Sequence, residues 1–194
     1  MPFIDLPAYQ LAAVPRAAIA ALRAALLRDA GAAAAAYLQE AGYAGGDALF
    51  AAFRAWLADR QPDATPEELD LSEFQALAAE FFRDAGWGSL ALTSLHDAVA
   101  ALDSEDWGES DPAAGLEHTG CHLSTGMFAA FFGHLAGAPL AVLEVECRSA
   151  GSERCRFLVG SAEVMQHVYD GLSAGSGYEE VLGAVAAAES AGGA

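Results

Sequence analysis

The stretch PLAVLEVECRSAGSERCRFLVG, residues 139–160, decides the fold that the sequence predicts. Its two ends, PLAVLEVEC and ERCRFLVG, are short and rich in apolar residues, which is typical of strands. Ala150 and Gly151 lie between them, and a glycine there gives the backbone the freedom that a tight turn requires. We therefore expect two antiparallel strands joined by this turn.

A second pair of short apolar segments lies upstream. SLALTSL (89–95) and AVAALDS (98–104) are separated only by His96 and Asp97, a spacing that favours a β-hairpin. The polar and acidic stretch SEDWGESDPAAGLEHTG follows the second segment and predicts a loop.

Helices are expected between and after the two hairpins. CHLSTGMFAAFFGHLAG predicts a helix from about residue 121 to residue 135, in which the small residues Gly126, Ala130 and Gly133 permit close packing. SAEVMQHVYDGL, residues 161–172, has the pattern of an amphipathic helix.

The amino-terminal part of the chain is dense in alanine and leucine and predicts helices. Residues 15–42 end in glycine and fit one long helix or two abutting ones. The next helix is expected to be capped by Asp47 and to stop at Pro62. A further helix, LSEFQALAAEFFRDAGWG, has Ser72 and Gln75 at the spacing of a capping box.

Helices followed by strands, a helix, strands and a helix predict an α+β fold with an antiparallel sheet packed against helices. We expect one globular domain in three parts. Residues 1–85 form a helical segment that packs on the core, residues 86–175 form the core itself, and residues 176–194 form a short helix and a tail.

Composition limits the possible partners. The net charge of −18, from 27 acidic and nine basic residues, repels nucleic-acid backbones and anionic membrane surfaces, so we expect neither partner. No segment is long and apolar enough to span a bilayer, and MPFIDLPAYQ lacks the basic and apolar regions of a signal peptide. We therefore predict a cytoplasmic protein.

The three cysteines, Cys121, Cys147 and Cys155, are the residues most suited to a metal site. Three thiols cannot all pair, and cytosolic chains rarely keep structural disulfides. Glu144 lies three residues before Cys147, and three thiolates with one carboxylate complete the four-coordinate shell of zinc.

Three alternatives remain open from the residues alone. His118 or His122, which flank the first cysteine, can replace the glutamate as the fourth ligand. The cysteines can instead be small apolar residues of a core. They can also form a redox switch, in which oxidation releases a metal and pairs two thiols.

Three motifs in this region resemble those of a known family. A cysteine opens a glycine-containing helix in CHLSTGMFAAFFG, a strand ends in Glu-x-x-Cys in EVEC, and a glycine turn precedes Cys-x-Phe in CRF. In these motifs residues 86–160 resemble the 4-vinyl reductase domain family, whose fold is similar to that of subunits of the TRAPP tethering complex. In related sensor domains of phenol-responsive activators these positions hold zinc. The resemblance thus implies a structural zinc ion on Cys121, Glu144, Cys147 and Cys155.

The resemblance also implies a pocket for a small apolar or aromatic molecule between the helices and the sheet. The candidate lining residues combine aromatic rings with a few polar groups: Phe81, Phe82, Trp87, His96, Trp107, Phe128 and Phe132. The four phenylalanines can equally be core residues. We assign Trp107 to a lid, because an indole in so acidic a loop needs an apolar surface to cover.

We therefore predict a binding module, a zinc-stabilised homodimer that senses or carries a small hydrophobic molecule and passes a signal to a separate partner. The family name implies an alternative, an enzyme or accessory protein in the reduction of a tetrapyrrole vinyl group during bacteriochlorophyll synthesis. The sequence carries no nicotinamide or flavin fingerprint, so catalysis stays undecided. A protein-interaction scaffold is a further alternative.

Overall fold

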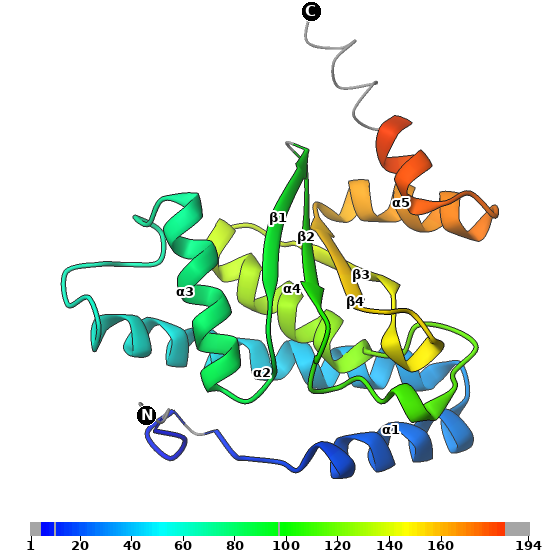
Figure 1. Cartoon of the computed structure of the whole chain (residues 1–194), viewed down its shortest axis with the longest axis horizontal. Coiled ribbons are helices and arrows are strands. Elements are labelled where there is room, and N and C mark those ends of the chain that lie inside the picture. The colour runs from blue at the N-terminus through cyan, green and yellow to red at the C-terminus, as the bar shows by residue number, and fades with distance from the viewer. Residues whose placement is uncertain (1–4, 10, 97, 185–194) are drawn as a thin grey trace, which may run out of the picture.

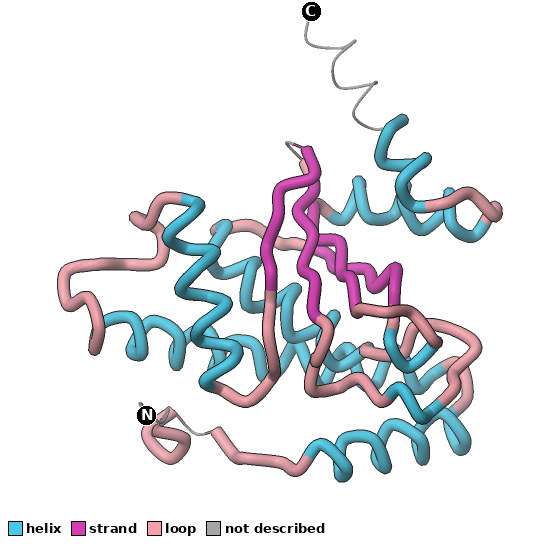
Figure 2. The backbone as a smooth tube through the Cα atoms, viewed as in Figure 1, coloured by secondary structure: helices cyan, strands magenta, loops and turns pink. Residues whose placement is uncertain are grey.

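A computed structural model describes residues 5–9, 11–96 and 98–184 of the chain, apart from the side chain of His96. Its centre is a four-stranded antiparallel sheet in the order β1-β2-β4-β3 (Figures 1 and 2). The strands are β1 (Ala91–His96), β2 (Val99–Ser104), β3 (Ala141–Glu146) and β4 (Cys155–Gly160). Both predicted hairpin pairs are confirmed, and β4 joins them by pairing with β2.

Helices cover both faces of this sheet. The helices are α1 (Arg16–Ala30), α2 (Ala33–Ala58), α3 (Leu71–Asp84), α4 (His122–Ala136) and α5 (Ala162–Ser173), and residues 178–184 are also helical. Figure 1 shows α2, α3 and α4 on one side of the sheet and α5 on the other. The predicted α+β fold is thus confirmed.

The amino-terminal helices differ from the prediction in one respect. We expected a helix to end at Gly42 and another to begin at Asp47, but α2 runs through both positions. The reason is tertiary packing, because α2 and α4 approach so closely that only glycine fits at their crossing. A Cβ atom at Gly42 would overlap the carbonyl oxygen of Leu123, and one at Gly126 would overlap that of Gln39. The predicted close packing of α4 at Gly126 is therefore confirmed.

The start of α3 also differs. The expected capping box of Ser72 and Gln75 is wrong, because Asp70 occupies the N-cap position and its carboxylate accepts a hydrogen bond of 2.8 Å from the amide of Glu73. Aspartate and serine are both good caps, so the pattern alone placed the start of the helix two residues late.

Two apolar clusters result from the alternation of side chains along the strands. The inner cluster, between the sheet and helices α2, α3 and α4, is dominated by aromatic rings: Phe50, Phe53, Trp56, Phe74, Phe81, Phe82, Trp107, Phe128, Phe131, Phe132 and Phe157. The outer cluster is smaller and aliphatic, and it packs Val99, Ala101 and Leu158 of the sheet against Met165 and Val168 of α5.

The predicted three-part division of the chain stays a prediction. Much of the expected carboxy-terminal tail, residues 185–194, lies outside the described residues. Within the described part of the chain, no helix combines the length and the apolarity that crossing a bilayer requires.

Candidate metal centre

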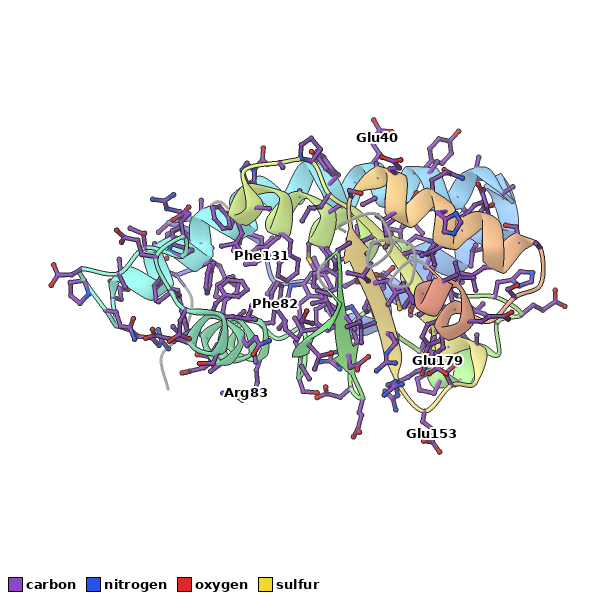
Figure 3. All side chains as sticks on the ribbon, turned by 90° about the horizontal axis from the view of Figure 1, so that it is seen from above. Glu40, Phe82, Arg83, Phe131, Glu153 and Glu179 are labelled. Carbon is purple, nitrogen blue, oxygen red and sulfur yellow. The ribbon has the colours of Figure 1, made fainter. Side chains whose placement is uncertain are left out.

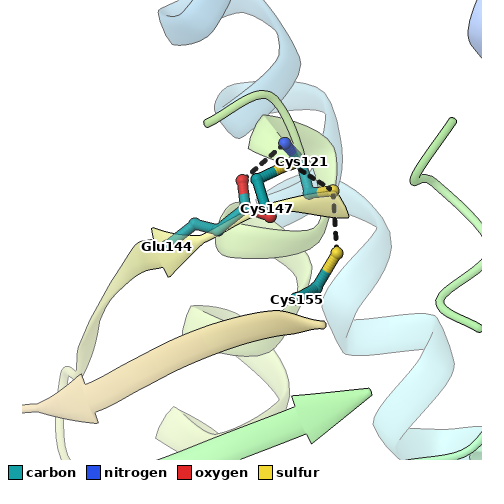
Figure 4. Close-up of side chains that lie close together, drawn as sticks. All are labelled: Cys121, Glu144, Cys147 and Cys155. Atoms are coloured by element: carbon teal, nitrogen blue, oxygen red, sulfur yellow. Dashed lines mark hydrogen bonds between the residues drawn. The ribbon is translucent and has the colours of Figure 1, made fainter. Parts of the chain in front are cut away.

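The four residues selected from the sequence meet at one end of the sheet (Figure 4). Cys121 is the N-cap residue of α4, Glu144 lies in β3, Cys147 follows β3 and Cys155 begins β4. One possible ligand atom from each residue can be chosen such that all four lie within 4.8 Å of one another. All four side chains are buried, and the three cysteines are free thiols.

The spacing of the sulfur atoms fits a tetrahedral metal ion. The Sγ atom of Cys121 lies 3.9 Å from the Sγ atoms of both Cys147 and Cys155. Zinc–sulfur bonds of about 2.3 Å at tetrahedral angles place sulfur atoms about 3.8 Å apart. A disulfide would need a sulfur–sulfur distance of about 2 Å. The cluster therefore has the dimensions of a metal shell.

Glu144 supplies the fourth donor and the clearest sign that a cation belongs here. Its Oε2 atom accepts a hydrogen bond of 2.8 Å from the amide of Cys121. Its Oε1 atom is buried and has no hydrogen-bond partner. A buried oxygen without a partner costs free energy, and coordination to a cation would remove that cost.

A short turn brings Cys147 and Cys155 together. After β3 the chain forms one turn of 3-10 helix, Arg148–Ala150, and then passes Gly151 at a φ of 92°, which favours glycine. The amide of Ser152 donates to the carbonyl of Cys147 over 3.1 Å and closes the turn. The predicted turn at Gly151 is confirmed.

The protonation of the cluster also points to a cation. Contacts with Cys121 and Cys155 lower the pKa of the Cys147 thiol far below its ordinary value. Contacts with Cys147 and then Cys155 raise the pKa of Cys121 far above it. The pKa of Cys155 rises to about 12, because Cys147 and burial outweigh the lowering contact with Cys121. Burial, followed by the charge on Cys147, raises the pKa of Glu144. All four groups can ionise together only if a cation balances them.

The two histidines proposed as alternative ligands lie apart from the group of four. His122 is half-buried on the first turn of α4, and His118 is exposed in the preceding loop. Both line a groove beside Glu144 and Cys147 but are not among the clustered donors. Burial lowers the pKa of His122. Among the described residues, the geometry therefore favours Glu144 as the fourth donor.

Glu109 is a buried carboxylate that the sequence analysis did not select. It is 1% exposed and accepts hydrogen bonds from the amides of Leu123 and Ser124, at 3.1 and 2.7 Å. It thus binds the free amides of the first turn of α4, next to Cys121. Burial raises its pKa, although the bonds from Ser124 oppose this shift. An acidic residue within an acidic loop carried no local signal of this position.

Four of the seven predicted ligand residues pack together in the inner cluster. Phe81, Phe82, Trp107 and Phe128 are fully buried, and the ring of Trp107 lies 5.0 Å from that of Phe128. The indole nitrogen of Trp107 donates to the hydroxyl of Ser124 over 2.7 Å. Trp107 is therefore a core residue and not the lid that we expected. Figure 3 shows the ring of Phe82 pointing inward, while Arg83 beside it points outward.

The other predicted ligand residues lie at cavities or outside the description. Phe132 lines a cavity of about 330 Å³ between the sheet, α3 and the end of α4. Trp87 stacks on Trp107 at 5.5 Å and lines a cavity of about 230 Å³ beneath Leu6 and Leu11. The side chain of His96 lies outside the described residues.

Comparison with known proteins now places the chain. Residues 106–161 match the 4-vinyl reductase domain, and all four clustered residues fall within this match. The chain therefore contains a domain of this family, and the resemblance inferred from the three motifs is confirmed. No curated protein sequence matches the chain.

Solved structures with a similar fold come from different settings. The phenol-responsive sensory domain of the transcription activator PoxR, crystallised with phenol, has a TM-score of 0.58 and 16% identity, over 79% of this chain and 77% of that chain. Subunit 3 of a trafficking protein particle complex from Naegleria fowleri, covalently bound to palmitic acid, has a TM-score of 0.58 and 12% identity, over 75% and 91%. A vinyl-4-reductase family protein from Methanocaldococcus jannaschii has a TM-score of 0.39 and 17% identity, over 57% and 77%. At these identities the first two likenesses establish the fold alone.

Proposed function

We propose that this protein binds a small, uncharged, largely apolar molecule and acts as a sensor or carrier, on a fold stabilised by zinc. The observation that carries the proposal is the cavity of about 330 Å³ between the sheet and helices α3 and α4. Its walls are mainly apolar, with Phe74, Leu92, Leu102 and Phe132 among them. Small-molecule sites are commonly concave and apolar, with a few polar groups that orient the ligand.

The lining of this cavity restricts the class of ligand. No charged side chain of the described residues lines it, so an ionised ligand would lose its hydration without gaining a partner. Gln75 and Thr93 offer hydrogen-bonding groups at the wall. These features favour a neutral aromatic or aliphatic molecule that carries at most a hydroxyl or carbonyl group.

The aromatic cluster gives such a ligand a route to the rest of the domain. Phe132 contacts Phe128 at a ring distance of 5.9 Å, and Phe128 contacts Trp107 at 5.0 Å. A molecule bound beside Phe132 would therefore press on a continuous stack of rings that leads to Trp107. This chain of contacts includes three of the residues predicted from the sequence.

Zinc is the metal that we propose for the Cys121, Glu144, Cys147 and Cys155 cluster. Thiolate and carboxylate donors are ordinary zinc ligands, and four protein donors leave no position for a reacting water. The ion would therefore stabilise the junction of α4 with β3 and β4 without acting in catalysis.

Titration with naphthalene, followed by tryptophan fluorescence and calorimetry, tests the binding proposal. Ala100 lies in the wall of the cavity, so Ala100→Leu fills it and is expected to abolish binding. Ala12→Leu is the matched control, because it places the same side chain in the separate cavity beside Trp87. Equal binding by both variants and the wild type, or loss only in the control, would contradict the proposed site. The predicted homodimer and signalling partner stay predictions, and light scattering tests the first.

A further inference from the structure

Strand β3 is an edge of the sheet, with β4 on one side. In the part of the chain that the structure describes, no strand pairs with its other side. Alternate residues of such a strand direct their N–H and C=O groups outward, where another extended segment can bind them. The six residues of β3 offer an edge about 20 Å long.

Two open depressions follow this edge end to end. The first, of about 330 Å³, lies between the start of β3 at Val142 and the side of α2 at Gln39 and Tyr43. The second, of about 900 Å³, lies between Leu143 and Leu172 of α5 and extends to the α1–α2 turn and the loop before α4. We call these two depressions the β3-edge groove. An extended chain paired with β3 would lie between α5 and α2.

The charges of the groove favour a basic occupant. Glu40 lines the first depression and Glu117 the second, and both are exposed. Figure 3 shows Glu40 projecting away from the body of the molecule. No arginine or lysine of the described residues lines either depression. A second copy of this chain would bring its own net charge of −18 to this acidic surface, which opposes self-association here.

We propose that the β3-edge groove binds an extended, basic segment of a partner protein, which adds to the sheet as a fifth strand beside β3. The backbone of the segment would pair with the free edge of β3. Its arginine or lysine side chains would face Glu40 and Glu117, and alternate apolar side chains would contact Tyr169 and Leu172. This interaction is separate from the proposed ligand cavity, which shares no lining residue with the larger depression and only Leu140 with the smaller one.

The test uses the full, zinc-loaded chain and a fluorescein-labelled peptide of alternating arginine and valine. Fluorescence anisotropy measures binding, and hydrogen exchange measures protection of the β3 amides. A peptide of alternating arginine and proline is the control, because it carries the same charge but its prolines cannot donate backbone hydrogen bonds. We expect the valine peptide to bind and to protect residues 141–146, and the proline peptide to do neither.

Paired charge reversals locate the interaction. Glu40→Lys with Glu117→Lys is expected to weaken binding about tenfold, the effect of losing two exposed ion pairs and adding repulsion. Asp63→Lys with Glu105→Lys changes the net charge equally at exposed positions outside the groove and is expected to change binding less than about twofold. Equal weakening by both pairs, absence of β3 protection, or protection that instead accompanies self-association of the chain would each overturn the proposal.

Discussion

Replacing Gly42 by alanine is expected to destabilise the protein, although alanine is the better helix former. Gly42 lies within α2 at its crossing with α4. A Cβ atom there would overlap the carbonyl oxygen of Leu123 and lie 2.9 Å from the amide nitrogen of Met127, against an ordinary contact of 3.4 Å or more. Both atoms belong to the backbone of α4, so no side-chain rotation relieves the clash and the helices must separate.

The magnitude follows from two opposing contributions. Overpacking of this kind costs about 1–3 kcal/mol, and the backbone contacts place Gly42→Ala at about 3 kcal/mol. Helix propensity returns about 1 kcal/mol. The expected net loss is about 2 kcal/mol in the free energy of unfolding, or about 4–8 °C in Tm for a chain of this size.

Gly45 provides a matched control in the same helix. A Cβ atom there meets nothing within 4 Å, so Gly45→Ala is expected to stabilise the protein by about 1 kcal/mol through helix propensity alone. Urea denaturation of both variants, with zinc held constant, measures the difference. If Gly42→Ala were as stable as Gly45→Ala, the close crossing of α2 and α4 would be refuted.

Three further predictions concern the metal centre and its surroundings. Cys155→Ser should lose the one zinc ion per chain that elemental analysis should find in the wild type, and retention of zinc would contradict the proposed ligand set. Hydrogen bonds from Ser89 lower the pKa of Asp106, so its stabilisation is present above about pH 4 and is lost as the pH falls through the lowered pKa. The stability difference between wild type and Asp106→Asn, under about 1 kcal/mol at this exposed site, should therefore shrink in acid, and a constant difference would refute the assignment. Tyr178→Phe removes the 2.6 Å hydrogen bond to Glu146 and should speed hydrogen exchange in residues 178–184 while leaving α3 unchanged.

Local patterns were sufficient for the parts of the fold whose signals are local. The expected helix over 121–135 corresponds to α4, His122–Ala136, and the expected hairpins correspond to β1–β2 and β3–β4. The donor cluster was predictable because donors in adjacent strands and at the start of a packed helix have few places to go once the sheet forms.

The errors arose where packing over long sequence distances decides the structure. Gly42 carries the signal of a helix end, yet it serves the contact with α4, which is more than 80 residues away in the sequence. Trp107 and Glu109 lie in an acidic loop, yet both are buried, because the indole completes the aromatic cluster and the carboxylate binds the amides that open α4. Neither role has a local pattern, since each depends on where α4 lies.

The two ends of the β3–β4 pair have different physical characters, and this asymmetry bears on how the proposed ligand could act. At one end the metal cluster holds the inner face, while Arg156 on the outer face pairs with Asp103 through two bonds of 2.7 Å. At the other end β4 runs past the apolar cavity, and Ser161, which lines that cavity, caps α5 by accepting from the amide of Val164. A ligand that filled the cavity would therefore act against a sheet fixed at its metal end. The element free to respond is α5, which also forms one wall of the β3-edge groove through Leu172.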